Sequence, residues 1–286
     1  AVLLCRVGLV VNVIATAGIG NTFSLMITNW SGNSLLIAII LVGLASLVLG
    51  MGLPVTAAYI VLGTLSAPAL YNLIVDGQII QMFISGTTSE EAKAILMLAI
   101  PDKIALLNQP LSPESAQELL SLIPPDLAGT LREISLSPES ATFALLSAHM
   151  IIFWLSQDSN VTPPVCLAAF TGAAIAGTPP MATGLRSWKI AKGLYIVPLL
   201  FAYTPLLGGS WPEIFTIFVF ALGGLYAFTC ALQGYMENPV GLPIRLLLLV
   251  LAVALLKPSA LAIQGVALGC LLLVLFFNFK KSGGPA

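Results

Sequence analysis

Long apolar segments with few charged residues alternate with short polar interruptions along most of the chain. A membrane-spanning helix needs about 20 consecutive apolar residues, so these segments are candidates to enter a bilayer. The candidate segments are 2–18, 34–50, 55–75, 141–157, 163–177, 190–207, 213–234, 243–256 and 259–279. Several are too short to cross alone. The pattern therefore predicts an all-α polytopic membrane protein in which some helices are interrupted.

Two pairs of neighbouring apolar segments are joined by very short connections. GMGLP at 50–54 joins the first pair, and region 34–75 is predicted to be a re-entrant helical hairpin that enters and leaves on one side. DSNVT at 158–162 joins the second pair, which is predicted to be one transmembrane helix broken near its middle. Pro163 and Pro164 follow this break, and neither has an N–H to donate, so the helix cannot continue across it.

The predicted breaks need a polar environment, because unwound backbone persists at membrane depth only inside protein or beside a cavity. Free carbonyl oxygens and hydroxyls at a break suit a small cation, and a half-helix N-terminus suits a carboxylate. The residues that offer oxygen ligands at the second break are Asp158, Ser159, Asn160 and Thr162. Those with corresponding features at the hairpin tip are Gly50 and Gly52 for close approach, Pro54 for starting the return helix, and Thr56 for its hydroxyl.

Asp158 is the most informative of these residues, since an ionisable side chain in a membrane segment is costly and usually lines a pathway. We expect it to bind a cation or a proton. The alternative is an aspartate that only caps the second half-helix. His149 is expected to pack by hydrogen bonding, and the tryptophans Trp30, Trp188 and Trp211 are expected to be interfacial anchors.

The composition agrees with a membrane protein: 58% of residues are hydrophobic and 8% are charged, against about 25% charged in soluble domains. The eleven Lys and Arg residues are scattered and form no basic face, so nucleic acid is not an expected partner. The four cysteines lie far apart in apolar segments, without the spacing of a metal site.

Nine of the twelve acidic residues lie in region 76–140, which is therefore excluded from lipid. The hexapeptide LSPESA occurs there twice, at 111–116 and 136–141. Ser-Pro-Glu is typical of a helix start, with serine as the cap and proline at the first helical position. Ser112 and Ser137 are thus predicted to begin two helices.

The basic residues predict an orientation, because they concentrate on the cytoplasmic side of membrane proteins. Arg186, Lys189 and Lys192 form one cluster, and Lys280 and Lys281 another. Four crossings between residues 190 and 279 place both clusters, and so the C-terminus, in the cytoplasm. Counting backwards, region 76–140 is extracytoplasmic and the hairpin opens to the outside.

Two stretches carry a family resemblance. GMGLPVTAAYIVLGTLSAPAL (50–70) and SNVTPPVCLAAFTGAAIAGTPPMATGLRSWKIAKGLYIVPLLFAYTPLL (159–207) resemble the large membrane subunit of tripartite ATP-independent periplasmic (TRAP) transporters. More narrowly, they resemble the fused permeases of the TAXI subclass. The resemblance covers 8–75 and 141–207, and the remaining apolar tail is similar to the C-terminal extension of those permeases.

The resemblance implies an elevator-type secondary transporter in the bacterial inner membrane that imports an organic acid, either a dicarboxylate or a glutamate-like acid. It implies a coupling cation, sodium or alternatively a proton, with no other cofactor and no enzymatic activity. The implied partners are an extracytoplasmic TAXI-type solute-binding protein and a small membrane subunit or fused N-terminal helices. On this basis the chain holds the second of two inverted repeats, as the C-terminal portion of a longer protein.

The expected site residues combine this resemblance with the chemistry of the two breaks, which adds Asp158. The expected cation-binding residues are Gly50, Gly52, Thr56, Asp158, Ser159, Asn160 and Thr162. The expected substrate-binding residues are Pro54, Thr56, Thr162 and Pro163. A metal site other than one for sodium is not expected.

Five regions are predicted along the chain. They are a scaffold helix and connector (1–33), the re-entrant hairpin (34–75), an acidic extracytoplasmic insertion with short helices (76–140), the broken transmembrane helix with the following helix (141–207), and a C-terminal transmembrane extension (208–286). The insertion departs from the family pattern, and is either a lid that contacts the binding protein or a surface insertion without a partner. The rival functions are a stand-alone cation/carboxylate symporter and an intramembrane enzyme.

Overall fold

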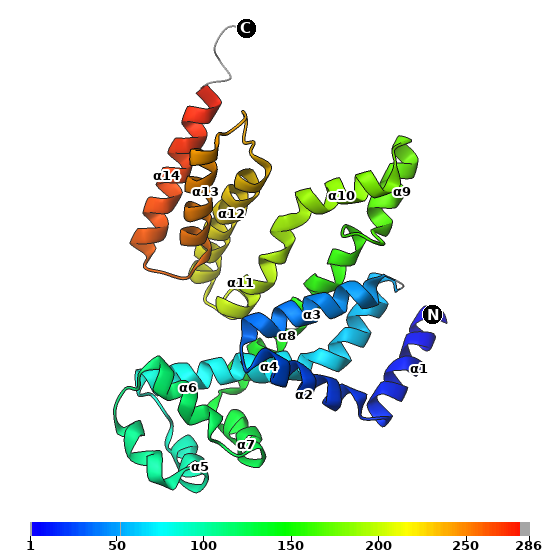
Figure 1. Cartoon of the computed structure of the whole chain (residues 1–286). Helices are drawn as coiled ribbons and strands as arrows, with labels where there is room; N and C mark the ends of the chain where they lie inside the picture. Colours follow the sequence, from blue (N-terminus) through cyan, green and yellow to red (C-terminus); the bar gives the residue numbers. More distant parts are fainter. Residues whose placement is uncertain (1, 52, 281–286) are drawn as a thin grey trace. The chain divides into compact units, whose positions relative to one another are not determined.

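The computed structural model describes residues 2–51 and 53–280. Gly52, which the sequence places at the hairpin tip, lies outside the described residues, as do residue 1 and residues 281–286. The described chain is built of helices, which carry the labels of Figure 1 below. Among the described residues, the β-type pairing is limited to an isolated antiparallel bridge between Tyr235 and Pro239.

The helices group into two compact units, each built from separate stretches of the chain. One unit holds residues 1–42 and 60–149, and the other holds residues 43–59 and 150–286. Both predicted breaks fall within the second unit, so this unit holds the candidate site.

Several helices are long and apolar enough to cross a membrane. Within the described residues there are four such spans, or five if a bent pair counts as one: Val55–Ser85, Pro138–Asn160, Trp211–Gln233, Leu261–Lys280, and the pair Gly8–Thr16 with Ile19–Ser31. Their length and composition fit the predicted polytopic membrane protein.

The N-terminal region is two helices where the sequence predicted one helix and a connector. Helix α1 (Val2–Thr16) and helix α2 (Ile19–Ser31) meet at a bend of 73°. Gly18 at the bend has a φ of 67°, a left-handed conformation that costs glycine little. Gly20 of α2 lies close to α4, since an added Cβ would be 3.0 Å from the carbonyl oxygen of Thr64.

The two hairpin helices are α3 (Leu35–Gly50) and α4 (Val55–Ser85). The predicted helix end at residue 75 is wrong, because α4 continues to Ser85 through Asp76. Both carboxylate oxygens of Asp76 accept hydrogen bonds from Arg132, at 2.8 and 2.9 Å. This bidentate pair compensates the charge. At about 1.5 Å per residue, the 31 residues of α4 exceed the roughly 30 Å hydrocarbon core.

The acidic region folds into short helices: α5 (Glu90–Ala99), η1 (Pro101–Asn108), α6 (Pro113–Ser121) and α7 (Pro125–Ser135). The predicted cap at Ser112 is confirmed, since its Oγ accepts from the N–H of Ser115 at 3.2 Å. Helix α5 packs against α7, and Leu96, Leu119 and Leu131 of these short helices are buried.

Helix α8 (Pro138–Gln157) begins at the second predicted cap, where Ser137 Oγ accepts from the N–H of Ser140 at 3.2 Å. After the break come α9 (Leu167–Ala176) and α10 (Pro180–Ile190), which pack against each other. A Cβ on Gly184 of α10 would collide with the sulfur of Cys166, so the glycine permits this close packing.

The expected apolar helix at 190–207 is not continuous. It consists of η3 (Ala191–Tyr195) and the seven-residue α11 (Val197–Tyr203). Pro198 lies at the start of α11, where its missing N–H costs nothing, whereas inside a longer helix it would remove a hydrogen bond. The expectation of one continuous apolar helix over 190–207 is therefore wrong.

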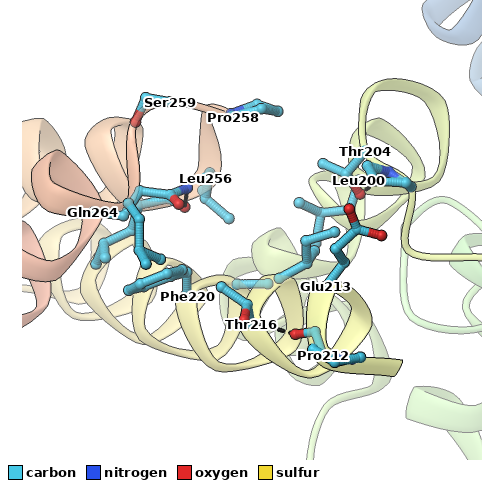
Figure 2. A pocket seen from close by; sticks show the side chains of 15 residues that line it. Leu200, Thr204, Pro212, Glu213, Thr216, Phe220, Leu256, Pro258, Ser259 and Gln264 are labelled. Carbon is cyan, nitrogen blue, oxygen red and sulfur yellow. Dashed lines mark hydrogen bonds between the residues drawn. The ribbon is translucent and has the colours of Figure 1, made fainter. Parts of the chain in front are cut away.

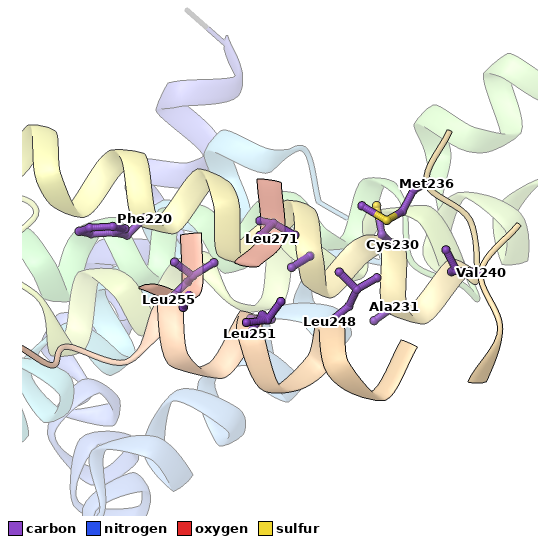
Figure 3. Packing of buried hydrophobic residues seen from close by; sticks show 12 residues of the cluster. Phe220, Cys230, Ala231, Met236, Val240, Leu248, Leu251, Leu255 and Leu271 are labelled. Atoms are coloured by element: carbon purple, nitrogen blue, oxygen red, sulfur yellow. The ribbon is translucent and has the colours of Figure 1, made fainter. Parts of the chain in front are cut away.

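The C-terminal helices α12 (Trp211–Gln233), α13 (Leu242–Leu256) and α14 (Leu261–Lys280) form a bundle. Their facing sides bury one apolar cluster, shown in Figure 3, that includes Phe220, Cys230, Leu248, Leu251, Leu255 and Leu271. Arg245 closes one end of the bundle by donating to the carbonyl oxygens of Ala231 and Leu232, at 2.7 and 3.1 Å. These carbonyls lie in the last turn of α12, where cations are favourable.

Candidate functional site

The helix break is present where the sequence predicted it. Helix α8 ends at Gln157, a single 3₁₀ turn covers Asp158–Asn160, and helix resumes only at Leu167. The second half-helix thus begins four residues later than the predicted 163. Pro163 and Pro164 occupy this gap and are joined by a cis peptide bond.

The side chain of Asp158 is buried at the break. The residue is 2% exposed, and its Oδ1 has no hydrogen-bond partner among the described residues. A buried carboxylate that lacks a partner is strongly unfavourable, and such a group calls for a bound ion or proton. The position fits a cation-binding role better than a capping role, because no cap hydrogen bond of Asp158 satisfies Oδ1.

The other predicted oxygen ligands surround the same turn. Ser159 is buried, and its Oγ donates to the carbonyl oxygen of Ser156 at 3.3 Å. The amide of Asn160 donates to the carbonyl oxygen of Gln157 at 3.3 Å. Both side chains are thus held at the break by backbone of the last α8 turn.

The end of α3 lies directly against the break. A Cβ placed on Gly50 would collide with the Cβ and Oγ of Ser159, so the two backbones approach as only glycine allows. Nearby, Ser46 Oγ donates to the carbonyl oxygen of Leu155 at 2.8 Å. The expected proximity of the hairpin tip and the broken helix is therefore confirmed at Gly50 and Ser159.

The remaining residues of the predicted tip are less informative. Gly52 lies outside the described residues, and Pro54 and Thr56 are exposed. Their expected roles in cation and substrate binding stay predictions.

A cavity of about 400 Å³ lies beside the break. Its lining consists of Leu47, Thr162, Pro163, Leu185, Trp188 and Tyr195. Thr162 Oγ1 and the hydroxyl of Tyr195 share a hydrogen bond of 2.7 Å. The amine of Lys192 lies over the Trp188 ring, 5.3 Å from its centroid.

Thr162 and Pro163 were expected at the site from the sequence. The rest of this lining was not, and Trp188 was expected at the membrane interface. A signal was present, because Leu185, Trp188, Lys192 and Tyr195 are spaced by three, four and three residues. That spacing puts them on one face of a helix.

A second cavity, of about 360 Å³, lies among α11, α12 and the α13–α14 connection (Figure 2). Several of its polar side chains are bonded within the protein. Glu213 Oε2 accepts from Ser210, Thr216 donates to the carbonyl oxygen of Pro212, and Gln264 donates to the carbonyl oxygens of Leu255 and Lys257.

The described residues contain no group of three or more His, Cys, Asp or Glu side chains that could hold a metal ion. A hard monovalent cation needs no such group, because carbonyl and hydroxyl oxygens with one carboxylate suffice. The donor set at Asp158 fits this second kind of site.

Comparison with known families gives one match. Residues 1–207 of the 286 match the family model described as "Tripartite ATP-independent periplasmic transporter, DctM component". No curated protein and no solved structure matches the chain. The matched residues include both breaks and the acidic region, and residues 208–286 lie outside them.

A family of membrane transporters and several apolar helices agree in describing a multi-pass protein of the inner membrane. Large components of these transporters work, in general, with an extracytoplasmic binding protein and a small membrane subunit. Since the match covers well over half of the chain, this protein belongs to the DctM family, the large membrane components of the TRAP transporters.

Proposed function

We propose that the chain is the permease part of a cation-coupled, elevator-type secondary transporter that imports an organic acid. The observation that carries the proposal is the buried Asp158, whose Oδ1 lacks a partner at a helix break that touches the hairpin tip at Gly50. A scaffold protein has no use for an uncompensated carboxylate at this depth. A cation carrier needs one.

The proposed coupling follows from the charge of Asp158. With the site unloaded, movement of the break through a low-dielectric region would carry a bare carboxylate, which is strongly unfavourable. A bound sodium ion neutralises this charge and lets the loaded site move. A proton on Asp158 would have the same electrostatic effect, so sodium and proton remain the two alternatives for the coupling ion.

The site residues are assigned accordingly. The proposed cation-binding residues are Gly50, Gly52, Thr56, Asp158, Ser159, Asn160 and Thr162. The proposed substrate-binding residues are Pro54, Thr56, Thr162 and Pro163. The support for these roles is the contact of Gly50 with Ser159 and the position of Thr162 and Pro163 in the cavity wall.

We assign the chain to the TAXI type, with residues 208–286 as a fused C-terminal extension and a TAXI-type solute-binding protein as the delivering partner. The proposed hairpin is re-entrant, the acidic region is extracytoplasmic, and the C-terminus is cytoplasmic. The concentration of acidic residues in this region and the length of α4, which exceeds a bilayer's hydrocarbon core, support an acidic region outside the lipid.

The test is sodium-driven uptake by proteoliposomes that contain the complete transporter and its binding protein. Asp158→Asn removes the charge with little change in shape and is expected to abolish the dependence of uptake on the sodium or proton gradient. The matched control is Asp102→Asn, the same change at an exposed position of η1, which is expected to behave like the wild type. Unchanged gradient dependence in a well-folded Asp158→Asn protein would overturn the ion-site assignment.

A further inference from the structure

We propose that the cavity beside the break binds a monocarboxylate with an apolar body, and that Trp188, Lys192 and Tyr195 select it. This inference rests on the proposed function and names the substrate class of its site. It narrows the dicarboxylate or glutamate-like acid that the family resemblance implies.

The walls of the cavity are mostly hydrocarbon. Leu47, Pro163, Leu185 and Trp188 contribute apolar surface, and no acidic or basic residue belongs to the lining. The volume of about 400 Å³ lies within the usual range for small-molecule sites, which are apolar with few polar groups. A ligand with several consecutive carbon atoms would be stabilised by burial here.

The polar groups of the cavity include a pair of hydroxyls. Thr162 Oγ1 and the Tyr195 hydroxyl are 2.7 Å apart, so one donates and the other accepts. The hydroxyl that accepts keeps its own hydrogen free for another acceptor. The pair can therefore donate one hydrogen bond to an oxygen atom of a ligand in the cavity.

A positive charge lies against Trp188, a residue of the cavity wall. The amine of Lys192 is held over the ring of Trp188, at 5.3 Å from its centroid, by a cation–π interaction. This position leaves the ammonium group able to pair with one carboxylate. A second carboxylate on the ligand would face leucine, proline and indole carbon atoms, where an unpaired charge is strongly unfavourable.

Direct binding to the purified complete transporter tests the inference with three six-carbon probes. Hexanoate carries one carboxylate, adipate carries two, and hexanamide carries none. We expect hexanoate to bind at least about tenfold more tightly than adipate and than hexanamide, because a single unpaired or missing charge contact is worth about this factor or more.

Variants locate the site. Trp188→Ala is expected to weaken hexanoate binding by about tenfold, since it removes a large apolar wall. Lys192→Gln is expected to remove the preference for hexanoate over hexanamide. The matched controls are Trp211→Ala and Lys189→Gln, which change the same residue types outside the cavity lining and are expected to bind hexanoate as the wild type does.

The inference is overturned if adipate binds as tightly as hexanoate, or if Lys192→Gln and Lys189→Gln proteins have the same affinity. Its failure is distinct from failure of the proposed function. Loss of gradient dependence in Asp158→Asn with no discrimination among the probes would leave ion coupling standing and refute the substrate class. If the transporter discriminates among the probes but Asp158→Asn leaves the gradient dependence of uptake unchanged, the substrate class stands and the ion-site assignment is refuted.

Discussion

The helix break and the C-terminal bundle lie in the same compact unit. They differ in whether their buried polar side chains have hydrogen-bond partners. In the bundle, Asn238 and Asn278 bond each other's backbone and side chains, at 2.8 to 3.4 Å. At the break, Asp158 Oδ1 is buried with no partner among the described residues. An unpaired buried polar group is costly, so the proposed ion site predicts that polar substitutions at the break change transport and that those in the bundle change stability.

The largest effect is expected from a substitution that prevents the close contact between the hairpin tip and the helix break. Gly50→Val adds a Cβ that would collide with the Cβ and Oγ of Ser159, a buried residue. Overpacking of this kind costs about 1–3 kcal/mol, so uptake by the complete transporter is expected to fall about 10- to 100-fold.

The control for Gly50→Val is Gly77→Val in α4, where an added Cβ meets nothing within 4 Å. Both variants first need a monodisperse gel-filtration profile, which shows that the protein folds. Equal uptake by the two variants would mean that the contact of Gly50 with Ser159 has no role in transport.

The second prediction concerns the bundle, where loss of a polar group is expected to lower stability and leave transport intact. Asn278→Leu preserves the approximate size of the side chain but leaves the N–H of Asn238 without its acceptor. An unsatisfied buried N–H costs about 1–3 kcal/mol, so the thermal unfolding midpoint is expected to fall. Asn29→Leu, at an exposed position, is the control and is expected to leave the midpoint unchanged. A loss of uptake in folded Asn278→Leu protein would contradict the division of roles.

Local chemistry made several elements predictable from the sequence. Ser112 and Ser137 each begin a helix because a serine cap followed by proline needs only neighbouring residues to act. The break was predictable for the same reason, since Pro163 and Pro164 remove two N–H donors whatever the surrounding fold. Such features depend on a few consecutive residues, and they were located to within a few positions.

Features that depend on distant residues were not predictable in this way. Helix α4 passes the expected end at 75 because Asp76 pairs with Arg132, 56 residues later in the chain. Tyr195 reaches Thr162 across 33 residues, and Trp188 joins them through a change from α-helix to 3₁₀ helix at Ala191. The sequence therefore predicted the break itself but not the cavity beside it.

A third prediction concerns the hydroxyl of Thr162 at the break. Thr162→Val keeps the shape of the side chain but removes its hydrogen bond to Tyr195, at a cost of about 1–1.5 kcal/mol. The half-saturating sodium concentration for uptake is expected to rise about tenfold. Thr162→Ser keeps the hydroxyl and is the control. An unchanged sodium requirement in Thr162→Val would remove this residue from the cation site.

The smallest effect is expected from an exposed ion pair that lies outside both the helix break and the C-terminal bundle. Lys103 donates to Glu118 of α6 at 2.7 Å, and this hydrogen bond, with the charge of Lys103, lowers the pKa of the Glu118 carboxyl below 4.5. A carboxyl whose pKa is lower in the folded state contributes stability above its unfolded pKa and loses it as the pH falls through the folded pKa.

Exposed ion pairs contribute little because solvent screens them. Glu118→Gln is therefore expected to speed hydrogen exchange of the α6 amides slightly at about pH 7, and the difference from the wild type is expected to vanish in acid. Glu114→Gln, a change of the same kind on the same helix, is the control. An effect of Glu118→Gln as large as that of Asn278→Leu would show that partnering and burial do not decide how much a polar group matters in this protein.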